Sequence, residues 1–319
     1  MKYDQEVSST QISFDVTFNL VLFYLLILAG FLLSRITPYG KKVQNYLNPL
    51  LINFMLPLLI ISTLFDVAFD TLTESPQVIA ITALMHLVGA LLLFLYLKTK
   101  NFKPENDGAL LLCATFHNAV FLPLPLSHAF LGPAAVPLIA VHSLTQMILL
   151  TTLGALIGSY YNQESIDRES VVRKALLFPP LLATIIGFVL SILSVSVPSP
   201  FSVVISVNNT ATTYLSLLAV GLALGKEFSL YHSRQALSVV GVRQIAIPLL
   251  VWFVLGFTDL APLTKDVLFL ESLMPSAVLT VVYASDFGLN SQVAATSVTI
   301  GTIVLLPLLP FLPFLLSFV

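Results

Sequence analysis

One apolar segment with a polar, proline-containing middle constrains the fold more than any other feature. Residues 108–131, GALLLCATFHNAVFLPLPLSHAFL, are long and apolar enough to cross a bilayer. Their middle carries His117 and Asn118. Pro123 and Pro125 follow, so the helical hydrogen-bond ladder must break at membrane depth. Unpaired backbone groups are tolerated there only beside other protein or a water-filled cavity. The segment therefore predicts an interrupted helix at a binding site.

A second segment of the same kind lies in the other half of the chain. Residues 266–288, DVLFLESLMPSAVLTVVYASDFG, place Glu271, Ser272, Pro275 and Ser276 among apolar neighbours. Two interrupted spans in corresponding halves are the strongest sequence signal for the midplane site of a secondary transporter. The sequence therefore predicts two broken, crossing helices.

The composition is that of a polytopic membrane protein in a lipid bilayer. Hydrophobic residues make up 57% of the 319 residues and charged residues only 9%, against about 25% charged in soluble domains. The net charge of -2 is spread over short connectors, so no nucleic-acid partner is expected. The single cysteine, Cys113, excludes an intramolecular disulfide and a cysteine-based metal site. No enzyme motif or Walker motif is present, so we expect no enzyme activity, no cofactor and transport driven by a gradient.

Ten apolar windows predict an all-α protein with ten membrane spans. The connector at residues 159–173 divides the chain into a first five-helix repeat, residues 1–158, and a second, residues 174–319. The fourth and ninth windows are the interrupted ones, and an odd number of spans per half makes the repeats inverted. The windows are residues 14–36, 44–67, 77–97, 108–131, 134–159, 174–197, 201–225, 235–257, 263–287 and 291–319.

The placement of charge predicts the orientation. Most of the 14 basic residues fall in the connectors after the first, third, fifth and seventh windows. Connectors rich in Lys and Arg stay in the cytoplasm. Asp66, Asp70 and Glu74 fall on the opposite side. We therefore expect both termini outside the cytoplasm, in the plasma (cytoplasmic) membrane, and a polar start that is not a cleaved signal peptide.

Three motifs resemble the auxin efflux carrier family. The stretch TFHNAVFLPLPL resembles the family's fourth-helix signature, and NPLLINFMLPLLIISTLF its second helix. The clearest similarity is residues 272–311, SLMPSAVLTVVYASDFGLNSQVAATSVTIGTIVLLPLLPF, which carry the family's crossover proline at Pro275. The resemblance implies a ten-helix carrier of organic anions, in which a transport domain with two crossing helices moves, elevator-fashion, against a scaffold. Plant members move auxin, bacterial relatives are associated with small dicarboxylates, and the related bile acid sodium symporters share the fold. A homodimer through the scaffold is a family expectation.

The residues at the two breaks are the expected site. Asn118 is predicted to bind a substrate carboxylate beside helix N-termini, which carry partial positive charge. The structural alternative is that Asn118 satisfies the broken backbone. His117 stands where plant members have Pro, and it is expected to bind substrate, carry a proton or bond the backbone. Pro275 belongs to the crossover, and the Ser276 hydroxyl is expected to contact ion or substrate or to cap the backbone.

Glu271 is an ionisable group inside a span, which marks a functional site unless the charge is paired. Plant carriers lack this acid, whereas the sodium-coupled bile acid carriers have a Glu shortly before the ninth-helix crossover. Glu271 is therefore the predicted coupling residue, with Ser276 and His117 beside it. We expect a sodium ion at Glu271, with a proton as the alternative and no other metal. The structural alternative is an ion pair with Arg243, the other charge within a span.

Four further polar residues are weaker substrate-binding candidates: Asn53, His86, His142 and Gln146. His142 and Gln146 are four residues apart and share a helix face. For each, an interhelical hydrogen bond is at least as good an explanation as a ligand contact. The predicted function is secondary active transport of a small organic anion, an auxin-like monocarboxylate before a malate-like acid. A channel is the rival class.

Overall fold

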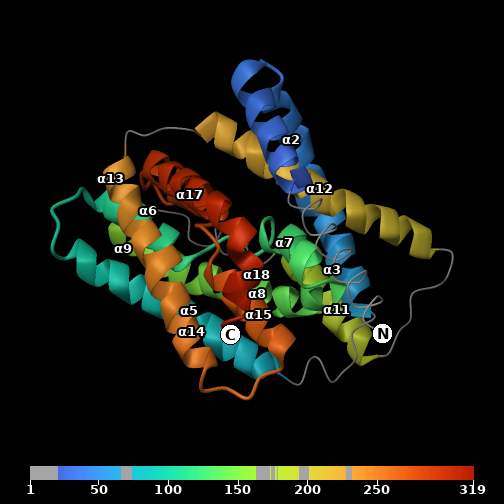
Figure 1. The fold of residues 1–319 in the computed structure, drawn as a ribbon. Coiled ribbons are helices and arrows are strands. Elements are labelled where there is room, and N and C mark those ends of the chain that lie inside the picture. The colour runs from blue at the N-terminus through green and yellow to red at the C-terminus, as the bar shows by residue number, and fades with distance from the viewer. Residues whose placement is uncertain are drawn as a thin grey trace.

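The described chain is helical throughout. The structure is a computed structural model that describes residues 21–65, 74–162, 179–193, 201–227 and 232–319, with Arg173 and Leu177. These residues form helices joined by short connectors, and their only β-type pairing is one isolated bridge (Figure 1). The all-α prediction is confirmed for this part of the chain. Residues 1–20, Asp66, Asp70 and residues 163–172 of the predicted linker lie outside it.

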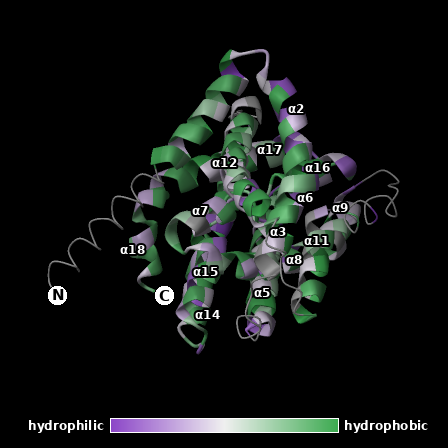
Figure 2. Cartoon of the chain, turned by 90° about the vertical axis from the view of Figure 1, so that its right-hand side faces the viewer, coloured by the Kyte–Doolittle hydropathy of each residue, from purple (hydrophilic) through white to green (hydrophobic). Residues whose placement is uncertain are grey.

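Several helices are long and apolar enough to cross a membrane. Within the described ranges, six meet this requirement, and the helix Val21–Ile36 is a shorter apolar one. The six are Gly40–Ser62, Ser75–Leu97, Pro133–Tyr161, Ser202–Gly225, Ser233–Leu255 and Ser291–Leu316. Much of the helical ribbon in Figure 2 is green, the colour of hydrophobic residues, although α2 is partly hydrophilic. Large side chains such as Phe54 and Phe257 are 70% and 79% exposed. Such an apolar exterior fits lipid, so the chain is a polytopic membrane protein.

The other helices follow one another along the chain, and some are interrupted by irregular turns. Three short π-helical turns, η1, η3 and η5, interrupt long helices, a feature that often accompanies functional sites. The elements other than the interrupted helices are α2 (Gly40–Leu50), η1 (Leu51–Met55), α3 (Leu56–Phe65), α5 (Ser75–Leu97), η2 (Pro133–Ala135), α8 (Val136–Leu149), η3 (Leu150–Gly154), α9 (Ala155–Tyr161), α11 (Pro179–Ile192), α12 (Ser202–Glu227), α13 (Ser233–Gly241), η5 (Val242–Ala246), α14 (Ile247–Leu255), α17 (Ser291–Leu305), η6 (Leu306–Phe311) and α18 (Leu312–Leu316).

Both proline-containing apolar segments consist of two helices separated by a break. The first consists of α6 (Pro104–Thr115) and α7 (Pro123–Phe130), and the second of α15 (Pro262–Ser272) and α16 (Leu279–Asp286). Pro123 stands in the first turn of α7, where its fixed φ favours a helix start and its missing N–H costs nothing. A glycine with positive φ, Gly132 or Gly288, follows each second half-helix. The two segments therefore have the same order of half-helix, break, half-helix and glycine.

The two breaks pair with each other. The Asn118 N–H donates to the Pro275 carbonyl at 2.8 Å, and the Ala277 N–H donates to the Phe116 carbonyl at 3.0 Å. This forms an antiparallel bridge between His117 and Ser276. Backbone groups released by one helix are thus satisfied by the other, which is what burial in a membrane protein requires.

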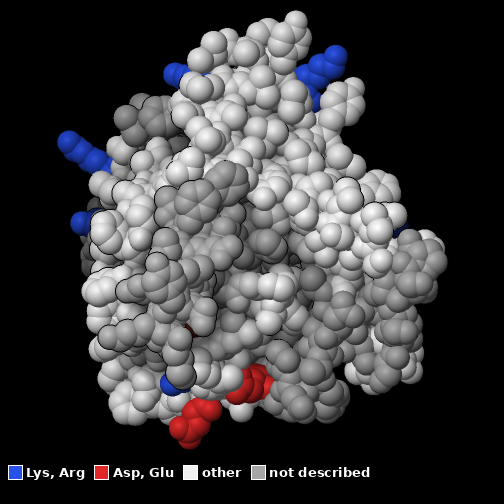
Figure 3. Space-filling view, turned by 45° about the vertical axis from the view of Figure 1, so that its right-hand side comes forward, with Lys and Arg blue, Asp and Glu red and all other residues white. Residues whose placement is uncertain are grey.

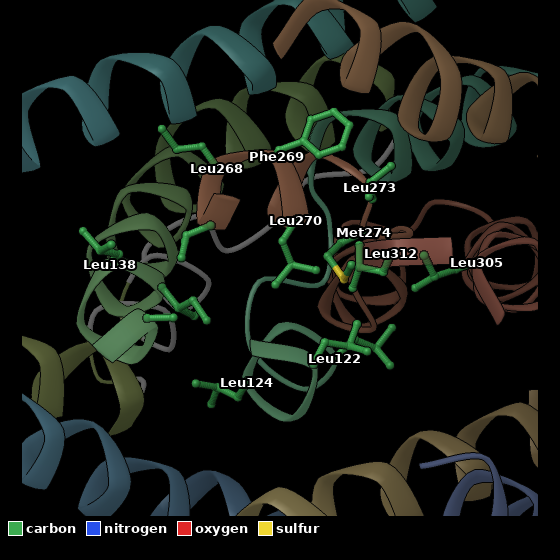
Figure 4. Packing of buried hydrophobic residues seen from close by; sticks show 14 of the residues in the cluster. Leu122, Leu124, Leu138, Leu268, Phe269, Leu270, Leu273, Met274, Leu305 and Leu312 are labelled. Carbon is green, nitrogen blue, oxygen red and sulfur yellow. The ribbon is translucent and has the colours of Figure 1, made fainter. Parts of the chain in front are cut away.

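A leucine-rich core holds the half-helices in place. Figure 4 shows Leu122 and Leu124 at the start of α7 facing side chains of α15, such as Leu270, across a common interior. Leu138 of α8 and Leu312 of α18 complete the cluster. Each buried leucine contributes about 1.5–3 kcal/mol. The second half of one broken helix is therefore packed on the first half of the other.

Small residues bring the helix Val21–Ile36 against α12. A Cβ at Gly221 would lie 2.1 Å from the Ile27 carbonyl oxygen, and one at Gly30 would lie 2.3 Å from the Leu218 carbonyl oxygen. Only glycine permits this distance between the two backbones. The small residues of the predicted seventh span therefore allow close helix approach, as membrane helix interfaces commonly do.

The surface charges are divided between the two ends of the molecule. In Figure 3 the visible acidic side chains gather at one end, and most of the visible basic side chains lie toward the other end and the flanks. Lys41 begins α2, whereas Glu74 stands beyond the far end of α3, just before α5. This separation agrees with the charge-based topology. The count of ten spans and the inverted repeats stay predictions.

Candidate functional site

Three ionisable side chains converge beside the paired breaks. His117 comes from the first break, His142 from α8 and Glu271 from the last turn of α15. The two histidine Nε2 atoms are 2.8 Å apart. Glu271 Oε2 lies 3.3 Å from His117 Nε2 and 3.8 Å from His142 Nε2. All three side chains are fully buried. The structure thus brings together residues that are far apart in the sequence.

A hydrogen-bond network from α5 fixes the orientation of this cluster. Thr82 Oγ1 lies 2.7 Å from His142 Nδ1, and His86 Nδ1 donates to the Thr82 carbonyl at 2.6 Å. Gln146 Oε1 lies 2.9 Å from His86 Nε2, and Gln146 Nε2 donates to the His117 carbonyl at 2.8 Å. His86 and Gln146 therefore orient the cluster, which corresponds to the interhelical alternative in the sequence analysis.

Glu271 and Arg243 are both buried, but they form no ion pair with each other. In the described part of the chain, both carboxylate oxygens of Glu271 lack a hydrogen-bond partner, and so do all three guanidinium nitrogens of Arg243. Within the described residues the ion-pair contacts of Glu271 are those to the two histidines. Arg243, in η5, interacts electrostatically with Glu271 from beyond contact distance. The structural alternative of a Glu271–Arg243 pair is therefore not realised.

The oxygen and the nitrogen of the Asn118 side-chain amide have different surroundings. Its Oδ1 accepts a hydrogen bond from the Phe121 N–H at 2.9 Å and longer ones from Val120 and Leu122 at 3.4 Å. This satisfies the backbone that leads into α7, in the manner of a helix cap. Its Nδ2 makes no hydrogen bond to the described residues. The donor side of the amide thus remains free for a ligand.

Ser276 and Pro275 maintain the break. The Ser276 hydroxyl donates to the Cys113 carbonyl at 2.8 Å, near the end of α6. Pro275 presents its carbonyl to Asn118, and its ring packs on Gly301, where a Cβ would lie 3.0 Å from Pro275 Cβ. For Ser276 the capping alternative is therefore what the structure contains.

A cavity opens where the two second half-helices begin. Its volume is about 60 Å³, and its polar lining consists of His117, Asn118, Ser143 and Gln146. The backbone on either side is that of residues 118–121, leading into α7, and 277–279, leading into α16. The rest of the lining is mainly apolar. Ligand pockets usually measure about 300–1,000 Å³, so this cavity is smaller than a typical ligand site.

One predicted site residue lies elsewhere. Asn53, in η1, has an exposed side chain, and the structure does not bring it to the cluster. Sequence reasoning missed Thr82, which holds His142. The sequence does contain a signal for it: Thr82 and His86 are four residues apart, as His142 and Gln146 are, so each pair shares a helix face. The structure packs the two helices, α5 and α8, together.

Comparison with known proteins assigns the class. Residues 15–313 match the family model described as membrane transport protein. An uncharacterized transporter of Methanothermobacter thermautotrophicus is 23% identical over 283 residues, which cover 88% of this chain and 91% of the relative. One of Methanocaldococcus jannaschii is 24% identical over 285 residues, covering 87% and 91%. The molecule is a membrane transport protein. The chain belongs to the auxin efflux carrier family.

Proposed function

We propose that the protein is a secondary active carrier of a small organic anion. The observation that supports this most is the position of the cavity, at the N-terminal ends of both α7 and α16 and beside the free Nδ2 of Asn118. Helix N-termini and an amide donor together favour a carboxylate. This is also how broken helices bind anionic substrates in other carriers.

The lining favours a substrate with an apolar body. Leu56, Val120, Phe121 and Met147 surround the cavity, and within the described residues no ionisable side chain other than His117 borders it. One carboxylate at Asn118 and an apolar remainder fit this lining, so an auxin-like monocarboxylate is the proposed class. A malate-like dicarboxylate is the second candidate, and it fits less well because the buried Arg243 does not border the cavity.

Glu271 is the proposed coupling residue. Its carboxylate is buried, has no hydrogen-bond partner and lies beside His117 and His142. Sodium prefers oxygen ligands, whereas two imidazole nitrogens flank this carboxylate. A proton therefore fits these surroundings better than the sodium ion expected from the sequence, and sodium remains the alternative.

The proposed mechanism is alternating access of the elevator type. The helix Val21–Ile36, α2, α3, α11 and α12 form one group, with α5, α6, α13 and α17 around the breaks in another (Figure 1). Movement of the second group against the first would expose the cavity to either side in turn. We propose ten spans in two inverted repeats, a homodimer through the first group, and both termini outside the cytoplasm of a plasma-membrane protein.

Labelling of introduced cysteines tests this orientation. Cysteines at Lys41, in the first turn of α2, and at Gln77, in the first turn of α5, are expected to react with an impermeant thiol reagent from opposite sides. Lys41 should react only from the cytoplasm. The native Cys113 is buried, so the unchanged protein should give little background. Reaction of both positions from the same side would contradict the topology.

Substrate counterflow tests the function itself. Purified protein in liposomes preloaded with indole-3-acetate or malate should accelerate entry of the same labelled acid, with saturation at high concentration. Thermal stabilisation of the detergent-solubilised protein by each acid then ranks the two substrates. Tighter binding of malate would reverse the preference for a monocarboxylate. Flux that neither saturates nor shows counterflow would favour a channel.

A further inference from the structure

The geometry of His117, His142 and Glu271 is that of a metal-ligand set. The three potential ligand atoms are mutually separated by 2.8, 3.3 and 3.8 Å. Zinc binds histidine nitrogen and carboxylate oxygen at about 2.0–2.2 Å in a tetrahedron, which places neighbouring ligand atoms about 3.3 Å apart. The three observed distances lie on either side of 3.3 Å or equal it. Small side-chain rotations would therefore bring all three atoms within bonding distance of one ion.

One of the three ligands, His142, is already held by a neighbouring side chain. Thr82 Oγ1 lies 2.7 Å from His142 Nδ1, which leaves the Nε2 of that ring facing the cluster. Such a hydrogen bond on the far nitrogen is the usual support of a metal-bound histidine. Among the described residues His117 Nδ1 has no such partner, and neither Glu271 oxygen has a hydrogen-bond partner. A buried carboxylate without partners is costly unless something pairs with it.

The donor set selects the class of ion. Two imidazole nitrogens and one carboxylate suit zinc and neighbouring divalent transition metals, whereas magnesium and calcium prefer oxygen donors throughout. Three protein ligands leave a fourth coordination position, as in zinc sites that exchange a ligand. The ligands come from the first break, α8 and α15, so one ion would join both broken segments to a neighbouring helix.

We propose that His117, His142 and Glu271 bind one divalent transition-metal ion of the zinc class. This site stands on its ligands alone and does not depend on the identity of the transported anion. Arg243 disfavours metal binding at this site, because its buried positive charge repels a cation there. Arg243 interacts electrostatically with all three side chains. Removal of that charge should therefore strengthen metal binding, whereas removal of a ligand should weaken it.

Binding to the full-length protein in detergent is the direct test, with zinc and cobalt chlorides as the probes. Titration calorimetry is expected to show one saturable zinc site per chain. Bound cobalt should give the intense visible absorption of a tetrahedral complex, which reports the geometry without any substitution. His142→Gln and Glu271→Gln should each weaken zinc binding at least about 100-fold, and Thr82→Val about 10-fold.

Two further variants make the result specific. Arg243→Gln should tighten zinc binding by about tenfold or more, since it removes a like charge from a buried site. His232→Gln changes a histidine at the start of α13, outside the cluster, and should leave the zinc affinity unchanged. The unfolding temperature of each variant without metal shows that it is folded. No saturable zinc binding by the wild type, or wild-type zinc affinity in both ligand variants, would overturn the proposal, and neither result tests which anion is transported.

Discussion

Replacing Glu271 with glutamine is expected to abolish uptake driven by a cation gradient, lowering the initial rate by about two orders of magnitude. Glutamine keeps the size of the side chain but holds no charge, and Glu271 is the only buried acidic residue in the described part of the chain. Uptake into proteoliposomes should be measured under a sodium gradient without a pH gradient, and then under a pH gradient without sodium. The gradient that drives the wild type identifies the ion.

A matched variant separates this effect from a general loss of charge. Glu105→Gln makes the same chemical change in the first turn of α6, where the side chain is only partly buried and lies outside the cluster. It should keep the wild-type rate under both gradients. Glu271→Gln should also fold, because neither oxygen of Glu271 accepts a hydrogen bond that the substitution would break. Wild-type flux that ignores both gradients contradicts coupling, and an unimpaired Glu271→Gln removes this residue from the mechanism.

The sequence predicts the breaks because their causes are local. Pro123 and the polar pair His117–Asn118 act on their own backbone, so their effect does not depend on distant neighbours. The apolar spans are equally local, since bilayer thickness fixes their length. The partner of each freed backbone group is different. The hydrogen bond from Asn118 to Pro275 joins residues from opposite halves of the chain, and hydropathy carries no record of it.

The same distinction explains what was and was not expected at the site. A charge within a span is rare enough to be noticed, so Glu271, Arg243 and His117 were each singled out. Hydropathy does not say which charges meet. The sequence offers Arg243 as a partner of Glu271, whereas the structure places two histidines there, and Arg243 has no hydrogen-bond partner among the described residues. Which buried groups lack a partner is decided by the packing of the whole molecule, not by the local sequence.

Asn118 offers a second experiment with a large expected effect, because its two ends do different things. Asn118→Asp keeps the oxygen that accepts from the Phe121 N–H, and Asp is as good a helix cap as Asn. It replaces the free Nδ2 donor with a second carboxylate oxygen beside the cavity. A fixed negative charge there should repel the transported anion and weaken its binding by at least about 100-fold, with little change in the unfolding temperature.

Asn118→Ala supplies the comparison that separates structure from recognition. It removes both ends of the amide, so it should destabilise the protein by about 1 kcal/mol through the lost cap. Its anion binding should weaken by about 10- to 100-fold, since one hydrogen bond to a charged ligand is lost but no repulsion is added. Anion affinity from thermal shift and counterflow should therefore fall in the order wild type, Ala, Asp, while stability falls in the order wild type, Asp, Ala. If Asn118 only caps α7, the two orders would coincide and Asp would transport as well as the wild type.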